Sequence, residues 1–407
     1  MKKIFIVLVI ISLVSCKPEE KPVNNDWYAR ILDSIYYDVG DGGGLVTDGR
    51  TFEQRFEQIS PDMISGSFGH IIGNIDYVME GGVFELPVSG ATGYAAVELS
   101  VYEAARIDNR SRILALSPGR GFTILYEEND WWYIEVDHIR GWVMHRYCLI
   151  NLPDIIPSIV YNITNTYYSL FRTSGLAISY ITGAALYEGK DFNVRLGREE
   201  YISAVLYSMA PKIFAAQQAA LAQGNTLVIY EAFRPAEAHN EVHRELSTMV
   251  ESNPLVMDGV TANSFSMSWF LATAPYNHQR GTAIDVSLGR ITGWETGTTG
   301  SYTYVYITGH SEYPMQTQIH ELSVQAAIFS PGTNPRSTTA WRTAWFSSSV
   351  TDGTILLIKY CSDAGLTPLA SEWWHFNDLE GTEASTEMKN EGKYEIPNSY
   401  SRAPGQF

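Results

Sequence analysis

Hydrophobic and polar positions follow a short, interrupted pattern over residues 97–150. Brief runs rich in β-branched and aromatic residues are separated by the turn signals Pro118-Gly119, Asn129-Asp130 and Arg140-Gly141. Runs of this length between tight turns are typical of short β-strands. The pattern predicts a small all-β antiparallel barrel over residues 91–152, built on the runs VELSVY, RILAL, GFTILYE, WWYIEV and GWVMHRY.

Residues 153–407 mix the helical and the strand patterns. Apolar positions at helical spacing over residues 198–222 predict a helix, which Pro211 should kink or split. The segment 153–157, bounded by two prolines, is interpreted as a linker into this region. Further expected elements are strands at 227–230, 283–288 and 369–376 and helices at 235–250 and 340–364. The expected fold class is therefore α+β.

The first residues have the pattern of an export signal. Lys2 and Lys3 precede an apolar run that is too short for a bilayer, which needs about 20 residues. The run ends in Leu13-Val14-Ser15-Cys16, which resembles the lipobox of bacterial lipoproteins. The resemblance implies that residues 1–15 are a lipoprotein signal peptide, that Cys16 carries a lipid, and that the protein is anchored in the cell envelope. An ordinary signal peptide is the alternative.

Charge and cysteine content argue against several classes of protein. The chain of 407 residues has 28 Lys and Arg against 45 Asp and Glu, a net charge of −17, which argues against nucleic acid and against a polybasic membrane surface. Three cysteines are too few for a disulfide scaffold, and Cys148 and Cys361 are expected to be small buried hydrophobes. The charged, Pro-rich residues 16–26 predict a tether, and residues 27–90 stay unassigned.

The strands predicted over residues 91–152 also resemble bacterial SH3-like domains. In those domains an opening strand, a Pro-Gly-type turn, a Trp-containing strand and a Gly-Trp-Val segment follow one another. The corresponding segments here are Leu99-Ser100-Val101, Pro118-Gly119, Trp131-Trp132-Tyr133 and Gly141-Trp142-Val143. The resemblance implies binding to cell-wall peptides. The alternative is that these Trp side chains only fill the core.

Two short motifs hold candidate metal ligands. They are His278-Gln-Arg-Gly-Thr-Ala-Ile-Asp285 and Glu372-Trp-Trp-His375. Two His and one Asp suit Zn²⁺, and three protein ligands leave the fourth position open, as in catalytic rather than structural zinc sites. Glu372 would then be a proton acceptor beside the metal. Positions three apart on a regular strand face opposite ways, so Glu372 and His375 can share a cleft only across a turn or bulge.

Arg234 follows the strand expected at 227–230 and precedes a helix. A guanidinium at this place suits a developing oxyanion or a substrate carboxylate, and a surface salt bridge is the alternative. His239 and His243 share one face of that helix and offer a rival metal pair. Because the Glu between them is not placed as in H-E-x-x-H, a solvated helix face is the favoured interpretation.

Taken in order, these residues resemble the vancomycin-resistance type D-alanyl-D-alanine dipeptidases. That family carries an Arg-Pro step after a strand, then S-x-H-x-x-G-x-A-x-D, then E-W-W-H. The resemblance implies that His278, Asp285 and His375 bind one Zn²⁺ per chain, that Glu372 is the general acid and base, and that Arg234 polarises the scissile carbonyl. It also implies that residues 153–407 form a peptidase domain with helices flanking a central antiparallel sheet.

Two positions depart from the family pattern. Tyr276 stands where the family has Ser before the first His ligand, and His320 stands where it has an Asp that helps to hold the substrate amino group. Both are therefore candidate substrate-binding residues. Loss of a carboxylate favours a longer wall peptide over a free dipeptide. A Gly-, Thr- and Tyr-rich insert at 293–308 also lengthens the segment between the two ligand motifs.

The sequence thus predicts zinc-dependent hydrolysis of D-alanyl-D-alanine or of related D-Ala-containing peptidoglycan peptides. Carboxypeptidase or endopeptidase action on longer wall peptides, with D,D or L,D specificity, is one alternative. A non-catalytic peptidoglycan-binding lipoprotein is another. The expected partners are peptidoglycan stem peptides in the cleft, peptidoglycan at the SH3-like module and the membrane at the lipid anchor, with no nucleic acid.

Overall fold

The computed structural model of the chain describes residues 45–64, 84–272, 277–329 and 333–405. The predicted signal peptide, Cys16, the tether and Tyr276 lie outside these residues. All the described residues belong to one unit, Gly44–Phe407. Within them, no helix combines the length and the hydrophobicity needed to cross a membrane.

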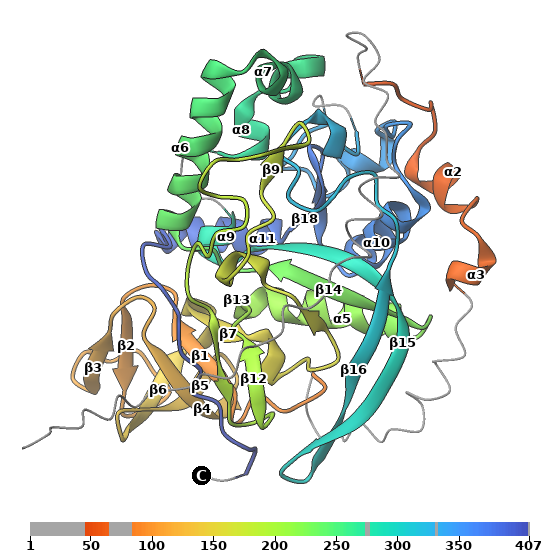
Figure 1. Cartoon of the computed structure of the whole chain (residues 1–407). Helices are drawn as coiled ribbons and strands as arrows, with labels where there is room; N and C mark the ends of the chain where they lie inside the picture. The colour runs from red at the N-terminus through yellow and green to blue at the C-terminus, as the bar shows by residue number, and fades with distance from the viewer. Residues whose placement is uncertain (1–44, 65–83, 273–276, 330–332, 406–407) are drawn as a thin grey trace, which may run out of the picture. The chain divides into compact units, whose positions relative to one another are not determined.

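The first sheet has eight antiparallel strands in the order β13-β7-β1-β4-β5-β6-β2-β3 (Figure 1). Each of the five predicted runs overlaps one of these strands, so the strand predictions are confirmed. Along the described residues the pairing path is open, with β13 and β3 at its edges, so a closed barrel is not shown. The strands are β1 (Thr92–Ala95), β2 (Leu99–Tyr102), β3 (Arg112–Leu116), β4 (Gly121–Glu128), β5 (Trp131–Val136), β6 (Ile139–Met144), β7 (Cys148–Asn151) and β13 (Ala204–Leu206).

Alternation along β5 explains which Trp side chains form the core of this sheet. Trp132 is fully buried, whereas Trp131 and Tyr133 on the other face of the strand are half-buried. The core interpretation therefore holds for Trp132. On the outer face, Tyr126, Tyr133 and Trp142 make a cluster with ring centroids 5.1–5.7 Å apart. We call this group the aromatic cluster.

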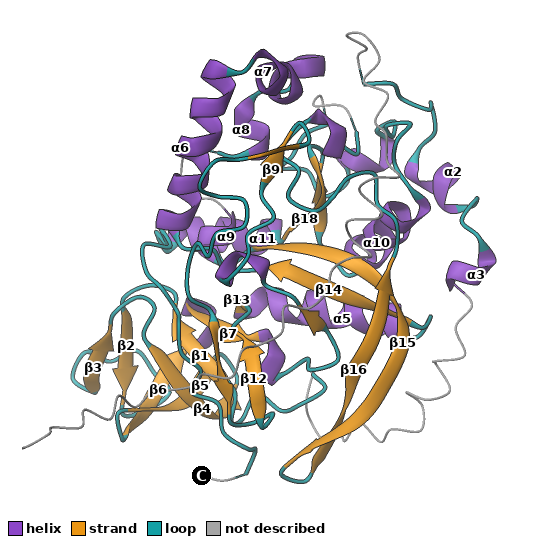
Figure 2. Ribbon diagram, in the orientation of Figure 1, coloured by secondary structure: helices purple, strands orange, loops and turns teal. Residues whose placement is uncertain are grey.

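The second sheet has six strands, and its main path runs β17-β18-β15-β14-β8, with β16 paired to β15. All its pairs are antiparallel except β14 with β8. The central antiparallel sheet implied by the family resemblance is thus present. Its strands are β8 (Val160–Tyr161), β14 (Asn225–Glu231), β15 (Ala283–Thr299), β16 (Tyr302–Glu312), β17 (Thr367–Leu369) and β18 (Glu372–Asn377). The insert at 293–308 forms the outer part of the long β15–β16 hairpin (Figure 2).

Helices and short elements complete the mixed α+β structure. Helix α5 packs against β14 and α10, and α10 also contacts β15, β17 and β18. The helices are α2 (Phe52–Phe56), α3 (Pro61–Ile64), α5 (Ala210–Leu221), α6 (Ala236–Ser252), α7 (Pro254–Thr261), α8 (Met267–Phe270), α9 (Asn277–Arg280), α10 (Asp352–Asp363) and α11 (Leu379–Glu387). Two small ribbons pair β9 (Arg172–Thr173) with β10 (Leu176–Ala177) and β11 (Lys190–Asn193) with β12 (Arg198–Tyr201).

The helix predicted over residues 198–222 was half wrong. Residues 198–209 form β12, β13 and a short 3-10 turn, and α5 begins only at Ala210. Pro211 lies in the first turn of α5 and neither kinks nor splits the helix. A proline is tolerated there because its missing N–H has no partner in the first turn of any helix. The helix predicted at 340–364 is likewise shortened to α10, after a 3-10 turn at Ala340–Thr343.

The predicted linker at 153–157 is wrong, because this segment is buried. Asp154 has no exposed surface and accepts hydrogen bonds from the Thr92 N–H (2.8 Å) and from Asn193 Nδ2 (2.6 Å). These bonds tie the segment to the first sheet and to the β11–β12 ribbon. The first sheet also takes its edge strand β13 from residues beyond this segment, so the two predicted domains share a sheet.

Candidate metal centre and catalytic cleft

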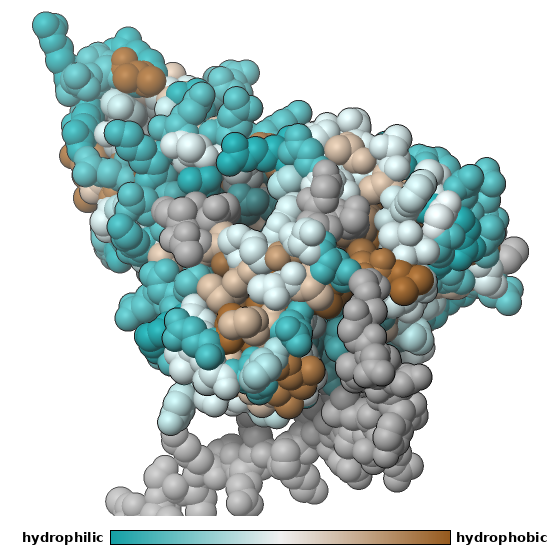
Figure 3. Space-filling model, turned by 90° about the horizontal axis from the view of Figure 1, so that it is seen from above, coloured by the Kyte–Doolittle hydropathy of each residue, from teal (hydrophilic) through white to brown (hydrophobic). Residues whose placement is uncertain are grey.

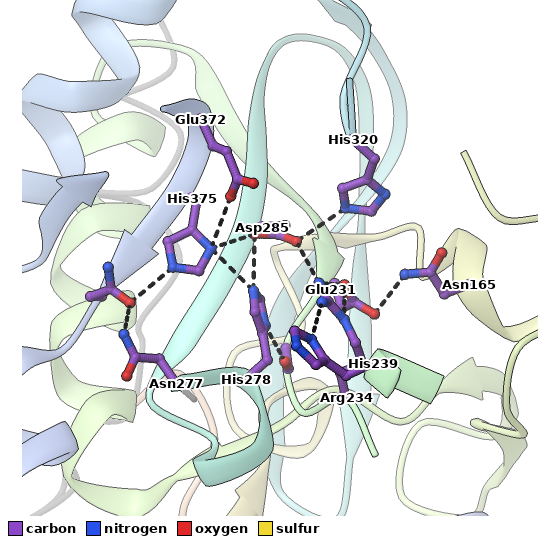
Figure 4. Close-up of polar contacts among 12 residues, drawn as sticks. Asn165, Glu231, Arg234, His239, Asn277, His278, Asp285, His320, Glu372 and His375 are labelled. Carbon is purple, nitrogen blue, oxygen red and sulfur yellow. Dashed lines mark hydrogen bonds and ion pairs between the residues drawn. The ribbon is translucent and has the colours of Figure 1, made fainter. Parts of the chain in front are cut away.

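Strand pairing in the second sheet brings the candidate residues together (Figure 4). Strand β15 lies between β14 and β18, and its register sets Asp285 opposite His375 on one side and opposite Glu231 on the other. His278 comes from α9, just before β15, and Arg234 follows the end of β14. Residues far apart in the sequence therefore meet in one place because the strands that carry them are neighbours.

The three candidate ligands form a compact triangle. The separations are 3.1 Å from His278 Nε2 to Asp285 Oδ1, 3.2 Å from His278 Nε2 to His375 Nδ1, and 3.0 Å from His375 Nδ1 to Asp285 Oδ1. Tetrahedral zinc with bonds of about 2.0–2.1 Å sets its ligand atoms about 3.3 Å apart. All three residues are buried. Their donor types and spacing therefore fit a zinc ion.

Both imidazoles are fixed through the nitrogen that points away from the triangle. His278 Nδ1 donates to the Ala232 carbonyl at 2.7 Å, which leaves Nε2 for a metal. His375 Nε2 donates to Asn377 Oδ1 at 2.9 Å, which leaves Nδ1. Asn277 Nδ2 also donates to Asn377 Oδ1 and holds it in place. Such outer partners set the tautomer and the orientation of ligand histidines.

The two oxygens of Asp285 have different partners. Oδ1 faces the triangle, whereas Oδ2 lies 3.1 Å from His320 Nε2 and 3.5 Å from Arg234 Nη2. Burial by itself would raise the pKa of Asp285, but His278, His320 and His375 together hold that pKa well below its usual range. The carboxyl is therefore ionised and ready to bind a cation.

Glu372 lies beside the triangle. Its Oε2 is 3.6 Å from His375 Nδ1, and its side chain is buried. Burial raises the pKa of Glu372 to about 8, against the opposing effect of His375. The bulge that the sequence required is present, because the pairing of β18 with β17 jumps from Phe376 to Glu372 between Pro368 and Leu369.

Arg234 is held on several sides. Its Nε and Nη2 donate to Glu231 Oε2, its Nη1 lies 3.2 Å from His239 Nδ1, and its guanidinium carbon is 4.9 Å from the centre of the Phe171 ring. Burial lowers and the Glu231 carboxylate raises the pKa of Arg234, which ends above its usual range. The guanidinium is therefore a fixed cation at the wall of the cleft.

Sequence reasoning missed two residues that support Arg234. Glu231 is one of them, and its place at the end of β14, three residues before Arg234, was a usable signal. The prediction that His239 belongs to a solvated helix face was wrong. His239 is buried and its Nε2 donates to the Ala272 carbonyl at 2.7 Å. Burial and the charge of Arg234 lower the pKa of His239 to about 4, so its ring is neutral.

His320 lies behind Asp285 rather than on the surface of the cleft. It is fully buried against Asp285, and it is not among the residues that line the cleft. The proposed role of His320 in substrate binding therefore has no support from its position. Tyr276 lies outside the described residues, as does Cys16.

A cleft of about 1090 Å³ opens in front of the metal ligands and Arg234. Its walls come from α8, α9 and α11 and from the segment around Arg336. Glu380, Glu383 and Glu387 line it along α11. On the face of the molecule drawn in Figure 3, the described hydrophobic side chains form small groups separated by hydrophilic ones. The lining of the cleft itself combines polar residues with apolar ones such as Phe270 and Leu271.

Comparison with known families agrees with this chemistry. Residues 197–391 match the model of the Peptidase_M15 family, D-ala-D-ala dipeptidase. The match contains Arg234, both ligand motifs and Glu372, and it leaves out strands β1–β7. It indicates a peptidase of a class that is generally zinc-dependent and that acts on D-Ala peptides or peptidoglycan. No curated protein matches the chain.

Proposed function

We propose that this protein is a zinc peptidase that cleaves D-Ala-containing peptides of the cell wall. The observation that carries the proposal is the triangle of His278, Asp285 and His375, which lies beside Glu372 and Arg234 in one cleft. The family match over residues 197–391 supports the reaction class.

Each residue has a separate task in this reaction. A bound zinc ion would supply Lewis-acid assistance and make water more acidic. Glu372 takes a proton from the attacking water and passes it to the leaving amine. Arg234 donates to the carbonyl oxygen as negative charge develops there, and its fixed position means that little reorganisation is needed during the reaction. Glu231 and His239 hold the guanidinium in that position.

The size of the cleft favours a substrate longer than a free dipeptide. Pockets for drug-sized ligands measure about 300–1000 Å³, and this cleft reaches about 1090 Å³. It also extends past the metal ligands along α11, where acidic side chains line its wall. Carboxypeptidase or endopeptidase action on a wall peptide is therefore the second candidate activity.

One experiment separates the two activities. Purified protein is incubated with zinc and either D-Ala-D-Ala or intact muropeptides, and the products are identified by mass spectrometry. Release of D-Ala from muropeptides, or their division into smaller muropeptides, with little dipeptide cleavage supports the wall-peptide activity, and the reverse supports the dipeptidase. If neither substrate is cleaved although zinc is bound, the proposed function is refuted.

We infer that the aromatic cluster on the first sheet contacts peptidoglycan. Tyr126 is 44 % exposed and packs edge-on to Trp142, so the cluster offers flat rings to a ligand. The substitution Trp142→Ala should lower binding to purified peptidoglycan in a sedimentation assay. Tyr180→Ala, which removes an exposed aromatic ring elsewhere, is the matched control. Equal binding by both variants would contradict this role.

We also propose that a lipid on Cys16 anchors the protein in the cell envelope, because the lipobox-like sequence ends at this cysteine. Cells fed a labelled fatty acid should label the wild-type protein and not the Cys16→Ala variant. Persistent labelling of the variant would contradict the proposal.

A further inference from the structure

The Oδ2 atom of Asp285 points away from the ligand triangle and towards His320, which indicates a role for this histidine. A carboxylate that binds a metal through one oxygen needs a partner for the other, or it can rotate and change its coordination. Here Asp285 Oδ1 belongs to the ligand triangle, and Oδ2 lies 3.1 Å from His320 Nε2. We propose that His320 is a positioning residue that fixes Asp285 as a one-oxygen zinc ligand, a proposal that rests on the zinc site of the proposed function.

Packing holds the His320 ring in the orientation that this contact requires. The ring stacks on Phe171 with centroids 4.5 Å apart and an interplanar angle of 20°, and the Trp374 ring meets it edge-on at 6.0 Å. Its backbone carbonyl accepts a hydrogen bond from the Arg172 N–H at 3.0 Å. His320 also has a φ of 63°, in the left-handed region that few residues other than glycine adopt. Several independent contacts therefore hold the ring against Asp285.

The hydrogen-bond pattern determines which ring nitrogen of His320 carries the hydrogen. Asp285 Oδ2 is an acceptor, so His320 Nε2 carries the hydrogen and donates it. His320 Nδ1 is buried and has no hydrogen-bond partner among the described residues. The ring therefore makes a single polar contact, and that contact is with the metal ligand.

A second metal site is the rival explanation of the same cluster. Glu231, Asp285 and His320 offer ligand atoms within 4.8 Å of one another. A carboxylate accepts about four hydrogen bonds, and Glu231 already accepts from Arg234 Nε and Nη2 at Oε2 and from Asn165 and Tyr187 at Oε1. The guanidinium of Arg234 thus supplies the positive charge at this place. His320 is left as a donor to Asp285 rather than as a ligand.

Zinc affinity of the full chain tests the proposal. His320→Phe keeps a ring to stack on Phe171 but removes the donor, and His320→Gln keeps an amide donor of similar reach. Loss of such an outer partner lowers metal affinity by roughly 10- to 100-fold, so His320→Phe should show this loss and His320→Gln should recover most of it. His243→Gln, a change in a histidine of α6 outside the cluster, is the control and should bind zinc like the wild type.

The dissociation constants are measured on metal-free protein by competition with a chromophoric chelator, and the zinc content by mass analysis. Folded His320→Phe protein with wild-type zinc affinity would overturn the proposal. Two zinc ions per wild-type chain, with one lost in His320→Phe, would also overturn it, because His320 would then be a ligand. A wild-type chain that binds no zinc would instead refute the proposed function itself.

A measurement on the wild type covers the case in which His320→Phe does not fold. Nitrogen-15 spectra of the histidine rings in the zinc-loaded protein should show His320 protonated at Nε2. After cadmium-113 replaces zinc, the rings of His278 and His375 should show coupling to the metal and the ring of His320 none. Coupling to His320, or an unprotonated Nε2, would refute the positioning role.

Discussion

Replacing Glu372 by Gln should make the metal-free protein more stable while it removes the reaction. Glu372 is 5 % exposed, and burial raises the pKa of its carboxyl from 4.5 to about 8. From the difference between the two pKa values, the buried carboxyl lowers the free energy of unfolding by about 3 kcal/mol at pH 7. Glutamine has nearly the same shape and no charge to desolvate, so Glu372→Gln should regain about that amount.

The stability of the wild type should change with pH in a definite direction. Because the folded-state pKa is above the unfolded-state pKa, the folded protein binds the extra proton between pH 4.5 and about pH 8. The stability of the wild type should fall as the pH rises through this window. Below pH 4.5 the carboxyl is neutral in both states, and the difference between wild type and Glu372→Gln should disappear.

Urea unfolding with a chelator present, measured at several pH values, checks this prediction. The exposed Glu188→Gln change is the matched control and should leave the stability nearly unaltered at every pH. A difference between wild type and Glu372→Gln that does not vary with pH would refute the reasoning. With zinc restored, Glu372→Gln should also lose about 10²- to 10⁴-fold in kcat, the usual contribution of a general acid–base residue.

Three further predictions follow from the site and the core. Arg234→Lys loses the paired hydrogen bonds to Glu231, so kcat/KM should fall by about 10²- to 10³-fold; a near-normal rate would contradict the role of Arg234. His278→Ala removes one corner of the triangle and should purify with well under one zinc per chain by mass analysis, whereas full occupancy would rule out His278 as a ligand. Ile229→Ala opens a cavity in the fully buried β14 and should lower the free energy of unfolding by about 2–5 kcal/mol in urea. A loss below about 1 kcal/mol would mean that the strand can repack.

The strands of the first sheet could be predicted because their signals are local. Each run is short, and a turn signal such as Asn129-Asp130 follows or precedes it, so neighbouring residues determine the strand boundaries. Whether the sheet closes into a barrel, and which strands pair, depends on residues that are far apart in the sequence. Strand β7 pairs on one side with β13, which lies more than fifty positions further along the chain, and nothing in the sequence near β7 indicates this neighbour.

The false helix over residues 198–209 has a definite cause. Strand β13 is buried on both faces, so Val205 and Leu206 show no alternation of apolar and polar residues. A short, fully buried strand cannot be distinguished from part of a buried helix by its period alone. Ile202 and Met209 then completed a helical spacing by chance, and only the pairing of β13 with β7 decides the structure.

The linker prediction failed for a related reason. The prolines at 153 and 157 indicate where the chain turns, but they say nothing about whether the turn faces water. Asp154 is buried because Thr92 and Asn193, from distant segments, supply hydrogen bonds to its carboxylate. Burial of a charged residue depends on such partners, and the partners become visible only after folding.

The sequence by itself determined which chemical groups the centre contains. A guanidinium, an imidazole, a carboxylate, a second acid and a second imidazole follow one another in that order along the chain. Tertiary structure alone decided how those groups are used. The Ala232 carbonyl leaves His278 Nε2 free, Asn377 leaves His375 Nδ1 free, and His320 leaves Asp285 Oδ1 free. The reason is physical: the orientation of a polar side chain is set by its hydrogen-bond partners, and here several of those partners come from segments far away in the chain.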